Sequence, residues 1–344
     1  MPHRNGALRV AVRVFVVAAG IACVAACERN PERAASTGDY PTRAVVLADW
    51  TPDGYASAGA AQSVSVIDGL GAHAVVVVIT AYQSDATNAM PAADPARTPS
   101  IASLGAVAAA VRARGLDLIV KPHVDLDDGT WRGTIHPRDI RGWFAAYRAF
   151  VLPLARWAQS AGASVFVVGT ELAGTIENES MWRALIAEVR QEFDGVVTYA
   201  ASWDEAALVP FWDAVDRTGV DFYAPVAGRK NPGRIELLAG WQPWIARLSQ
   251  LSQRTGHAIL LTEIGYRILD GAGENPFAFE PGGTPDPGEQ ADLYWAALEA
   301  LAGHNWLDGL CWWNWRVTGV AHEPTGYSPA GEPAEEVLRN AWTQ

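Results

Sequence analysis

The sequence lacks the features that mark several other classes of protein. It has three cysteines in 344 residues and more acidic than basic side chains, with a formal net charge of −12. That balance excludes the basic surface that nucleic-acid binding needs. No strand-like run leads into a Gly-x-Gly-x-x-Gly loop, and no Gly-x-Ser-x-Gly motif is present, which argues against dinucleotide-binding and esterase folds. An acidic chain with 15 tryptophans suits a neutral partner better than a polyanion.

The N-terminus has the pattern of a signal peptide. Three arginines without any acid precede an apolar run, residues 14–26, which is too short to span a membrane. The run ends in Val24-Ala25-Ala26-Cys27, which resembles the bacterial lipobox, where the cysteine is acylated and the chain is cut just before it. We therefore expect a signal peptide at 1–26, lipidation of Cys27 and a place in the cell envelope, on a bacterial membrane and facing the periplasm or the exterior.

Two alternatives remain for this segment. Cys23 is a weaker lipidation candidate, because Gly20 stands where an aliphatic residue is expected. The segment is otherwise an ordinary signal peptide with incidental cysteines. Residues 27–42 are polar and rich in turn formers, and they predict a tether. Cys311 would then have no partner for a disulfide and is expected to be buried.

From residue 43 to residue 344, short apolar runs alternate with helical patterns. Several of the runs are continuous in Val, Ile and Leu, as in parallel strands that are buried on both faces. The eight runs are Ala44–Ala48, Ala74–Thr80, Leu116–Val120, Ser164–Val168, Val196–Ala200, Val220–Ala224, Ala258–Thr262 and Leu307–Trp313. Helices are expected from Ser100 to Arg114 and near 137–160, 179–193, 205–215, 234–255 and 287–302. This alternation predicts an α/β fold, a (β/α)8 (TIM) barrel in one domain, and we expect a monomer.

In such barrels the active site lies at the carboxyl ends of the strands. Polar or aromatic groups follow all eight runs, and the aromatic share exceeds that of ordinary turns. The candidates for substrate binding are Trp50, Lys121, His123, Trp203, Tyr223, Trp313 and Trp315. Most of the 15 tryptophans are expected in the core, and a few as platforms for sugar rings.

Two glutamates occupy equivalent places. Glu171 ends the fourth run and Glu263 ends the seventh, on opposite sides of the barrel mouth. Glycoside hydrolysis uses such a pair, with one carboxylic acid to protonate the leaving oxygen and one carboxylate to attack the anomeric carbon. The alternative is two unrelated solvated or ion-paired carboxylates.

The two glutamates resemble those of clan A of the retaining glycoside hydrolases, and a fuller resemblance is to glycoside hydrolase family 113. The resembling segments include 120–125, 129–133, 168–172, 181–186, 197–201, 211–213 and 262–266. The resemblance implies endo-β-1,4-mannanase-like activity on a polysaccharide or oligosaccharide, such as mannan or glucomannan. It also implies Glu171 as acid/base, Glu263 as nucleophile, Tyr223 as donor to the nucleophile, and Trp313 or Trp315 as the floor of the sugar site.

Two residues depart from this pattern. Thr170 precedes the acid/base, where many clan members have Asn, and Ser202 stands before Trp203, where Asn is expected. Both changes fall at the expected sugar contact. They leave open a second hypothesis, a non-catalytic glycan-binding lipoprotein that kept the barrel.

A third hypothesis is a metal-dependent hydrolase. Residues 121–136 include five potential metal ligands: His123, Asp125, Asp127, Asp128 and His136. Metal sites in barrels draw ligands from several strand ends, and the other histidines do not fall there. We therefore expect neither a metal nor a cofactor. The Gly- and Pro-rich segment 271–288 is either a wall of the cleft or a plain surface loop.

Overall fold

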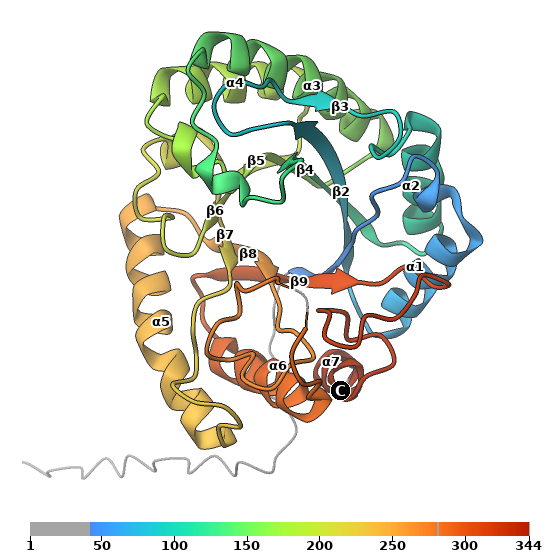
Figure 1. Cartoon of the computed structure of the whole chain (residues 1–344), viewed down its shortest axis with the longest axis vertical. Helices are drawn as coiled ribbons and strands as arrows, with labels where there is room; N and C mark the ends of the chain where they lie inside the picture. Colours follow the sequence, from blue (N-terminus) through green and yellow to red (C-terminus); the bar gives the residue numbers. More distant parts are fainter. Residues whose placement is uncertain (1–41, 281, 344) are drawn as a thin grey trace, which may run out of the picture. The chain divides into compact units, whose positions relative to one another are not determined.

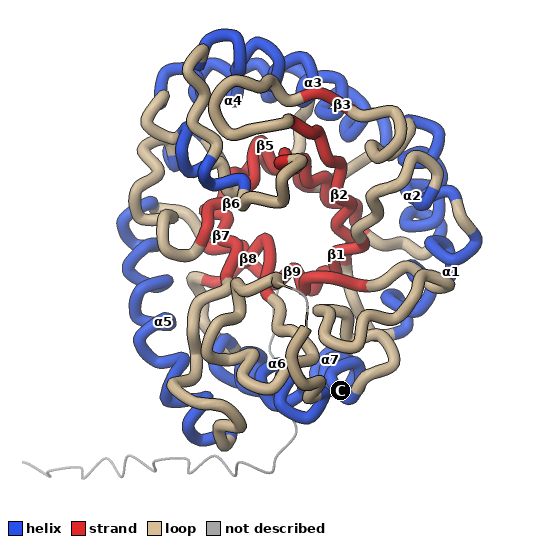
Figure 2. The backbone as a smooth tube through the Cα atoms, viewed as in Figure 1, coloured by secondary structure: helices blue, strands red, loops and turns tan. Residues whose placement is uncertain are grey.

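Eight parallel strands close into a barrel in the part of the chain that the computed structural model describes, residues 42–280 and 282–343 (Figures 1 and 2). The strands are β1 (Thr42–Leu47), β2 (Ala74–Gln83), β4 (Asp117–Leu126), β5 (Val165–Thr170), β6 (Val196–Ser202), β7 (Arg217–Phe222), β8 (Ile259–Ile264) and β9 (Leu307–Trp315). β1 pairs with both β2 and β9, which completes the ring. Each predicted run overlaps one strand, and the predicted barrel is confirmed.

Seven α-helices of the described residues surround the strands, as Figure 2 shows. They are α1 (Ala58–Gly69), α2 (Ile101–Ala113), α3 (Ile140–Ala161), α4 (Glu179–Glu192), α5 (Arg234–Thr255), α6 (Pro287–Leu301) and α7 (Pro333–Thr343). The sequence analysis missed α1 and α7. The short strand β3 (Ala92–Ala93) pairs antiparallel with β2.

The helix expected near 205–215 is wrong. Between β6 and β7 the chain forms turns and one 3-10 turn, η4 (Trp212–Ala214). Pro210 interrupts the helical pattern, since proline lacks the N–H that a helix interior needs. The side chain of Trp212 in this turn is buried, and its indole N–H donates to the carbonyl of Ala206 at 2.9 Å. The barrel thus has no α-helix after β6.

Elsewhere the helix ends follow the sequence pattern. Ser100 caps α2 through its hydroxyl, which accepts from the N–H of Ser103 at 3.1 Å. α3 and α5 end at Gly162 and Gly256, whose φ angles are +73° and +75°, a conformation that glycine adopts without steric cost.

Two apolar cores hold the barrel together. The larger one fills the space between the strands and the helices. The smaller one lies inside the barrel and consists mostly of small residues, including Ala44, Val46, Val76, Val78 and Cys311. Cys311 is buried, as expected. Because these interior side chains are small, polar groups on the layers above them have room to meet.

No helix among the described residues is both long and apolar enough to cross a membrane. The predicted signal peptide, Cys27 and nearly all of the tether lie outside the described residues, so the structure does not bear on them.

We predict that Tyr55→Phe destabilises the barrel near its closure. The buried hydroxyl of Tyr55 donates to the carbonyl of Leu47 at 2.7 Å and accepts from the N–H of Val78 at 3.0 Å, so it links β1 to β2. Its loss leaves two buried backbone groups unpaired, at a cost of about 1–3 kcal/mol. Thermal unfolding followed by circular dichroism should show a Tm lower by a few degrees, and an unchanged Tm would contradict the role.

Candidate active site

A cleft of about 620 Å³ opens at the carboxyl ends of the strands. Seven of its sixteen lining residues are aromatic, and both Glu171 and Glu263 are among the other nine. The two carboxylates from opposite sides of the barrel therefore face one space, as the sequence predicts. Both residues are buried, so the cleft holds them away from bulk water.

Glu263 lies within β8, and three side chains contact its carboxylate: two from β4 and one from the residue after β7. Its Oε1 accepts from Nζ of Lys121 at 2.6 Å and lies 3.4 Å from Nε2 of His123, and its Oε2 accepts from the hydroxyl of Tyr223 at 2.7 Å. Burial by itself raises the pKa of Glu263, but the charge of Lys121 and the contact with His123 outweigh burial and lower it. Glu263 is therefore a fixed carboxylate at neutral pH.

Lys121 is fully buried between two acids. Its Nζ also donates to Oδ1 of Asp221 on β7 at 2.7 Å, and the hydroxyl of Thr262 donates to the same oxygen at 2.7 Å. Burial lowers the pKa of Lys121, but the two carboxylates raise it above its ordinary value. Burial and the negative charge of Glu263 raise the pKa of Asp221.

The structure changes the role expected of Lys121 and His123. Their exposed fractions are 0% and 1%, so neither side chain reaches the cleft surface to hydrogen-bond a sugar. Burial lowers the pKa of His123 to about 4, so its ring is neutral at neutral pH. Both side chains contact Glu263 instead.

Glu171 follows β5 in a backbone conformation that is rare for its type. Its φ is +51°, and the register between β5 and β6 shifts just before it. Two hydrogen bonds hold the turn: the N–H of Glu171 donates to the carbonyl of Ala200 at 2.7 Å, and the next N–H, of Leu172, donates to the hydroxyl of Tyr199 at 2.9 Å. This strained turn fixes where the Glu171 carboxyl enters the cleft.

The surroundings of the Glu171 carboxyl differ from those of Glu263. Its Oε2 accepts from the indole N–H of Trp131 at 3.1 Å and lies 3.5 Å from Nη1 of Arg132. Burial raises the pKa of Glu171, the charge of Arg132 opposes that rise, and the charge of Glu263 adds to it. The net direction is upward, so Glu171 retains its proton to higher pH than an ordinary glutamate does.

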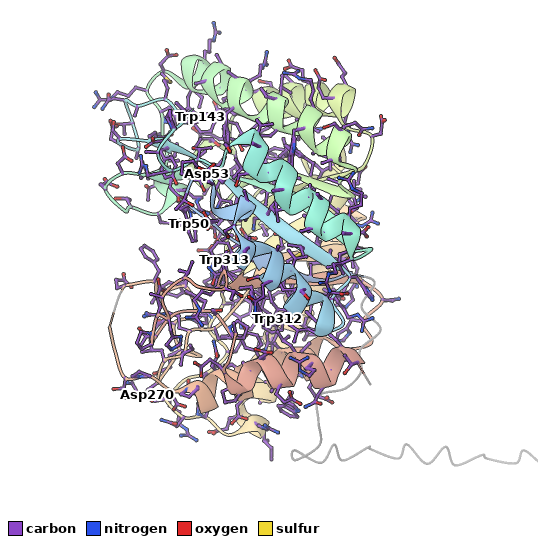
Figure 3. All side chains as sticks on the ribbon, turned by 90° about the vertical axis from the view of Figure 1, so that its right-hand side faces the viewer. Trp50, Asp53, Trp143, Asp270, Trp312 and Trp313 are labelled. Atoms are coloured by element: carbon purple, nitrogen blue, oxygen red, sulfur yellow. The ribbon has the colours of Figure 1, made fainter. Side chains whose placement is uncertain are left out.

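The structure places the tryptophans predicted to bind substrate partly in the cleft and partly in the core. Trp313 lines the cleft, stacks on His123 with ring centroids 5.9 Å apart, and meets Trp50 edge-on at 6.4 Å; Figure 3 shows Trp50 and Trp313 close together. Trp203 also lines the cleft. Trp315 is 3% exposed and belongs to the main core, so Trp313 is the one of the two that offers a floor for a sugar.

The two residues that depart from the family pattern, Thr170 and Ser202, lie in different surroundings. Thr170 is fully buried, and its hydroxyl donates to the carbonyl of Pro122 at 2.9 Å, so it does not face the cleft. Ser202 does line the cleft, where its hydroxyl donates to Oδ1 of Asp204 at 2.7 Å.

The sequence analysis left three residues of the site without a role: Trp131 and Arg132, which line the cleft, and Asp221, which is buried against Lys121. Trp131 and Arg132 lie in a segment of the family resemblance, which was the available signal. Asp221 lies inside a buried apolar run, where a charged residue is unusual and could itself have been a warning.

The acidic residues of the proposed metal segment are engaged elsewhere. Asp125 accepts from Nη2 of Arg132 at 2.6 Å, Asp127 from Nη2 of Arg97 at 2.8 Å, and Asp128 from the N–H of Thr130 at 2.8 Å. The three carboxylates thus bind three different partners and do not converge on one possible metal position.

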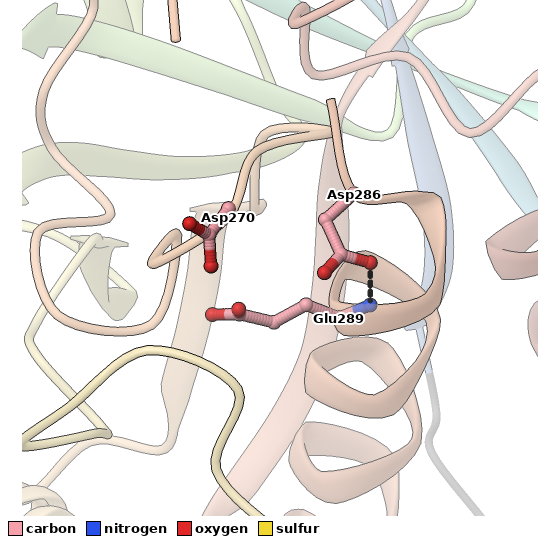
Figure 4. Close-up of side chains that lie close together, drawn as sticks. All are labelled: Asp270, Asp286 and Glu289. Carbon is pink, nitrogen blue, oxygen red and sulfur yellow. Dashed lines mark hydrogen bonds between the residues drawn. The ribbon is translucent and has the colours of Figure 1, made fainter. Parts of the chain in front are cut away.

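A different acidic cluster is the one group of possible metal ligands found among the described residues: Asp270, Asp286 and Glu289 (Figure 4). Glu289 accepts from three backbone N–H groups, those of Asn231, Gly271 and Gly273. Lys230 donates to Asp270 at 2.9 Å. None of the three acids lines the cleft, and they connect loops that follow β7 and β8.

We predict that Arg132→Met raises the pKa of Glu171 further. The guanidinium lowers that pKa, and its removal also leaves Asp125 without its partner, which works in the same direction. Carboxyl ¹³C chemical shifts in a pH titration should show Glu171 titrating at higher pH, while Arg132→Lys stays closer to the native value. A lower Glu171 pKa in Arg132→Met would contradict the geometry.

Comparisons with known proteins agree with this geometry. The family model for glycoside hydrolase family 113 matches residues 50–328. A β-mannanase of that family from Alicyclobacillus acidocaldarius, in complex with ManMIm, superposes with a TM-score of 0.80 at 25% identity, covering 91% of this chain and 98% of that one. Another structure, of a family 113 β-1,4-mannanase, has a TM-score of 0.80 at 24% identity, covering 89% of this chain and 99% of that one.

A β-glucuronidase from Faecalibacterium prausnitzii shares the barrel alone, with a TM-score of 0.59 at 11% identity over 89% of this chain and 49% of that one. A search of curated proteins finds no match. The match of the family model over most of the sequence, together with two glutamates in one cleft, establishes that the chain belongs to glycoside hydrolase family 113.

Proposed function

We propose that this glycoside hydrolase is a retaining, endo-acting β-1,4-mannanase that cleaves mannan or glucomannan. The observation that carries the catalytic part is the opposite environment of two glutamates in one cleft: Lys121 and Tyr223 hold Glu263 ionised, while burial raises the pKa of Glu171. The mannan part is supported by the family 113 structures that are titled β-mannanases.

In the proposed reaction the Glu171 carboxyl donates its proton to the glycosidic oxygen as the bond to the anomeric carbon breaks. The Glu263 carboxylate attacks that carbon from the opposite face and forms a covalent glycosyl ester. Glu171, now ionised, then takes a proton from water, and the resulting hydroxide displaces Glu263. Two inversions give overall retention.

The surrounding residues have supporting roles in this proposal. Trp313 floors the sugar that is cut, Trp50 and Trp203 contact neighbouring sugars, and Tyr223 orients the nucleophile. All of these groups come from one chain, so we propose that the monomer is the active unit.

Neither alternative hypothesis finds support. A non-catalytic binding protein has no need of a carboxylate held ionised by a fully buried lysine, since burying the two ions costs several kcal/mol each in lost hydration. The segment that suggested a metal-dependent enzyme has its carboxylates paired with Arg132, Arg97 and Thr130.

We predict that Glu263→Ala abolishes hydrolysis of mannan and that Glu171→Gln lowers kcat by about 10²–10⁴-fold, the usual contribution of a general acid. Reducing-end release measures both. The matched control is Glu205→Gln, a half-buried glutamate outside the cleft lining, whose pKa burial and Asp204 raise to about 7. We expect this control to retain most of the activity, and a loss as deep as that of Glu171→Gln would overturn the assignment of the acid.

The same preparation tests stereochemistry and substrate. ¹H NMR of the first products should show the β-anomer before mutarotation, and early α-anomer would mean inversion. Mannan and glucomannan should give a higher kcat/KM than xylan or cellulose. A preference for either of the latter would refute the mannan assignment but leave the glycoside hydrolase intact.

We further propose that the chain is made with a signal peptide, residues 1–26, and anchored by acylated Cys27 to a membrane of the cell envelope. The support is the run of Val24-Ala25-Ala26 before Cys27 after a basic start. In a bacterial host, Cys27→Ser should abolish incorporation of labelled palmitate and release the protein from the membrane fraction. Cys23→Ser is the matched control, and it should keep both the incorporation of palmitate and the association with the membrane fraction. The reverse pattern would assign the anchor to Cys23.

A further inference from the structure

Two phenylalanines on the loop between β8 and α6 stand unusually far into solvent. Phe277 is 50% exposed and Phe279 is 58% exposed, and both line the cleft that contains the two glutamates. Glu171 and Glu263 are 9% and 4% exposed. The phenylalanines therefore lie at the rim of the cleft and the carboxylates lie at its floor.

The loop that carries these rings is pinned to the barrel. Arg267, itself 7% exposed, donates from Nη1 to the carbonyl of Glu280 at 2.8 Å and from Nε to the carbonyl of Thr325 at 2.7 Å. The hydroxyl of Tyr327 donates to the carbonyl of Pro276 at 2.6 Å. The loop is thus fixed just before Phe277 and just after Phe279.

Holding two large apolar rings in water is unfavourable by about 25 cal/mol for each Å² exposed. A loop tip with no binding role favours small polar residues. Here the apolar rings are exposed, adjacent to the active cleft and presented by a buried arginine. That combination indicates a surface that is covered when a partner binds.

The cleft itself indicates the partner. Its lining also includes Trp203, after β6, and Trp313, on β9, and a β-linked polysaccharide has flat, apolar C–H faces that pack on aromatic rings. A polymer bound across Glu171 and Glu263 must leave the floor and pass the rim. The rim residues that a sugar ring would meet on the β8 side are Phe277 and Phe279.

We propose that Phe277 and Phe279 form a sugar-binding platform for a pyranose unit of the polymer that lies away from the bond being cut. The platform rests on the proposed function, because it requires a substrate of several sugar units. It makes the enzyme favour long chains over short ones and so favours cleavage within a polymer.

The test compares wild type, Phe277→Ala, Phe279→Ala and the double variant on manno-oligosaccharides of increasing length and on a short aryl mannoside. Loss of the platform should lower kcat/KM for the longest substrates by about tenfold, mainly through KM, which corresponds to the stacking contribution of an aromatic ring. The short aryl substrate should be unaffected, because it does not reach the rim.

The matched control is Leu208→Ala. Leu208 is 68% exposed on the loop after β6 and does not line the cleft, so its removal should change neither activity nor its dependence on chain length. Phe279→Trp keeps a flat face and should retain the preference for long substrates. Unchanged melting temperatures show that the loop variants are folded.

An equal loss of kcat/KM on short and long substrates in the Phe variants, or no loss on either, overturns the platform. Activity of the wild type on mannan still upholds the proposed function in that case. If wild type cleaves no mannan, the proposed substrate fails, and binding decides the platform. In that arm, affinity electrophoresis in gels containing a panel of β-glycans compares Glu263→Ala with and without the two Phe→Ala changes. The platform is overturned if retardation survives the loss of both rings. It is also overturned if sedimentation shows that the two Phe→Ala changes convert a dimer to a monomer, because the rings would then contact a second copy of the chain.

Discussion

The ion pairing of the buried ammonium group of Lys121 with Asp221 and Glu263 is the interaction on which the site depends. The ammonium group has no access to water, and it is stabilised by Asp221 at 2.7 Å and Glu263 at 2.6 Å. A buried charge of this kind persists only when its partners are fixed around it, since losing one leaves an uncompensated charge. The barrel supplies that rigidity, because β4, β7 and β8 bring the three groups together inside a closed ring of strands.

The same arrangement explains how one residue type takes two roles. Both carboxyls are desolvated, but Lys121 and His123 lower the pKa of Glu263, whereas burial outweighs the charge of Arg132 and raises the pKa of Glu171. Two carboxyl groups in one cleft also repel each other, so ionisation of one favours protonation of the other. The strained turn at Glu171 and the hydrogen bond from Tyr223 to Glu263 fix the positions between which a glycosidic bond would lie.

The scaffold and the cleft wall differ in how they are built. The strands and most helices follow apolar periodicity, and the missing helix after β6 changes the outer layer without opening the barrel. The loops after β4, β6 and β8 carry the groups that a substrate would meet, including Trp131, Trp203 and Phe277. Variation in these loops can change substrate preference without disturbing Lys121 and its partners.

The sequence by itself determined the barrel and the pairing of Glu171 with Glu263, which depend on local periodicity and on the rule that parallel strands end at one face. The contact of Tyr223 with Glu263 was expected only from the family resemblance, and the structure contains it. Only the tertiary structure decided that Lys121 is buried beneath Glu263 and that Trp313, not Trp315, faces the cleft. Trp313 and Trp315 are two residues apart and would share a face in a regular strand, but the register of β9 against β1 shifts between Trp312 and Trp315, which sends one ring to the cleft and the other to the core.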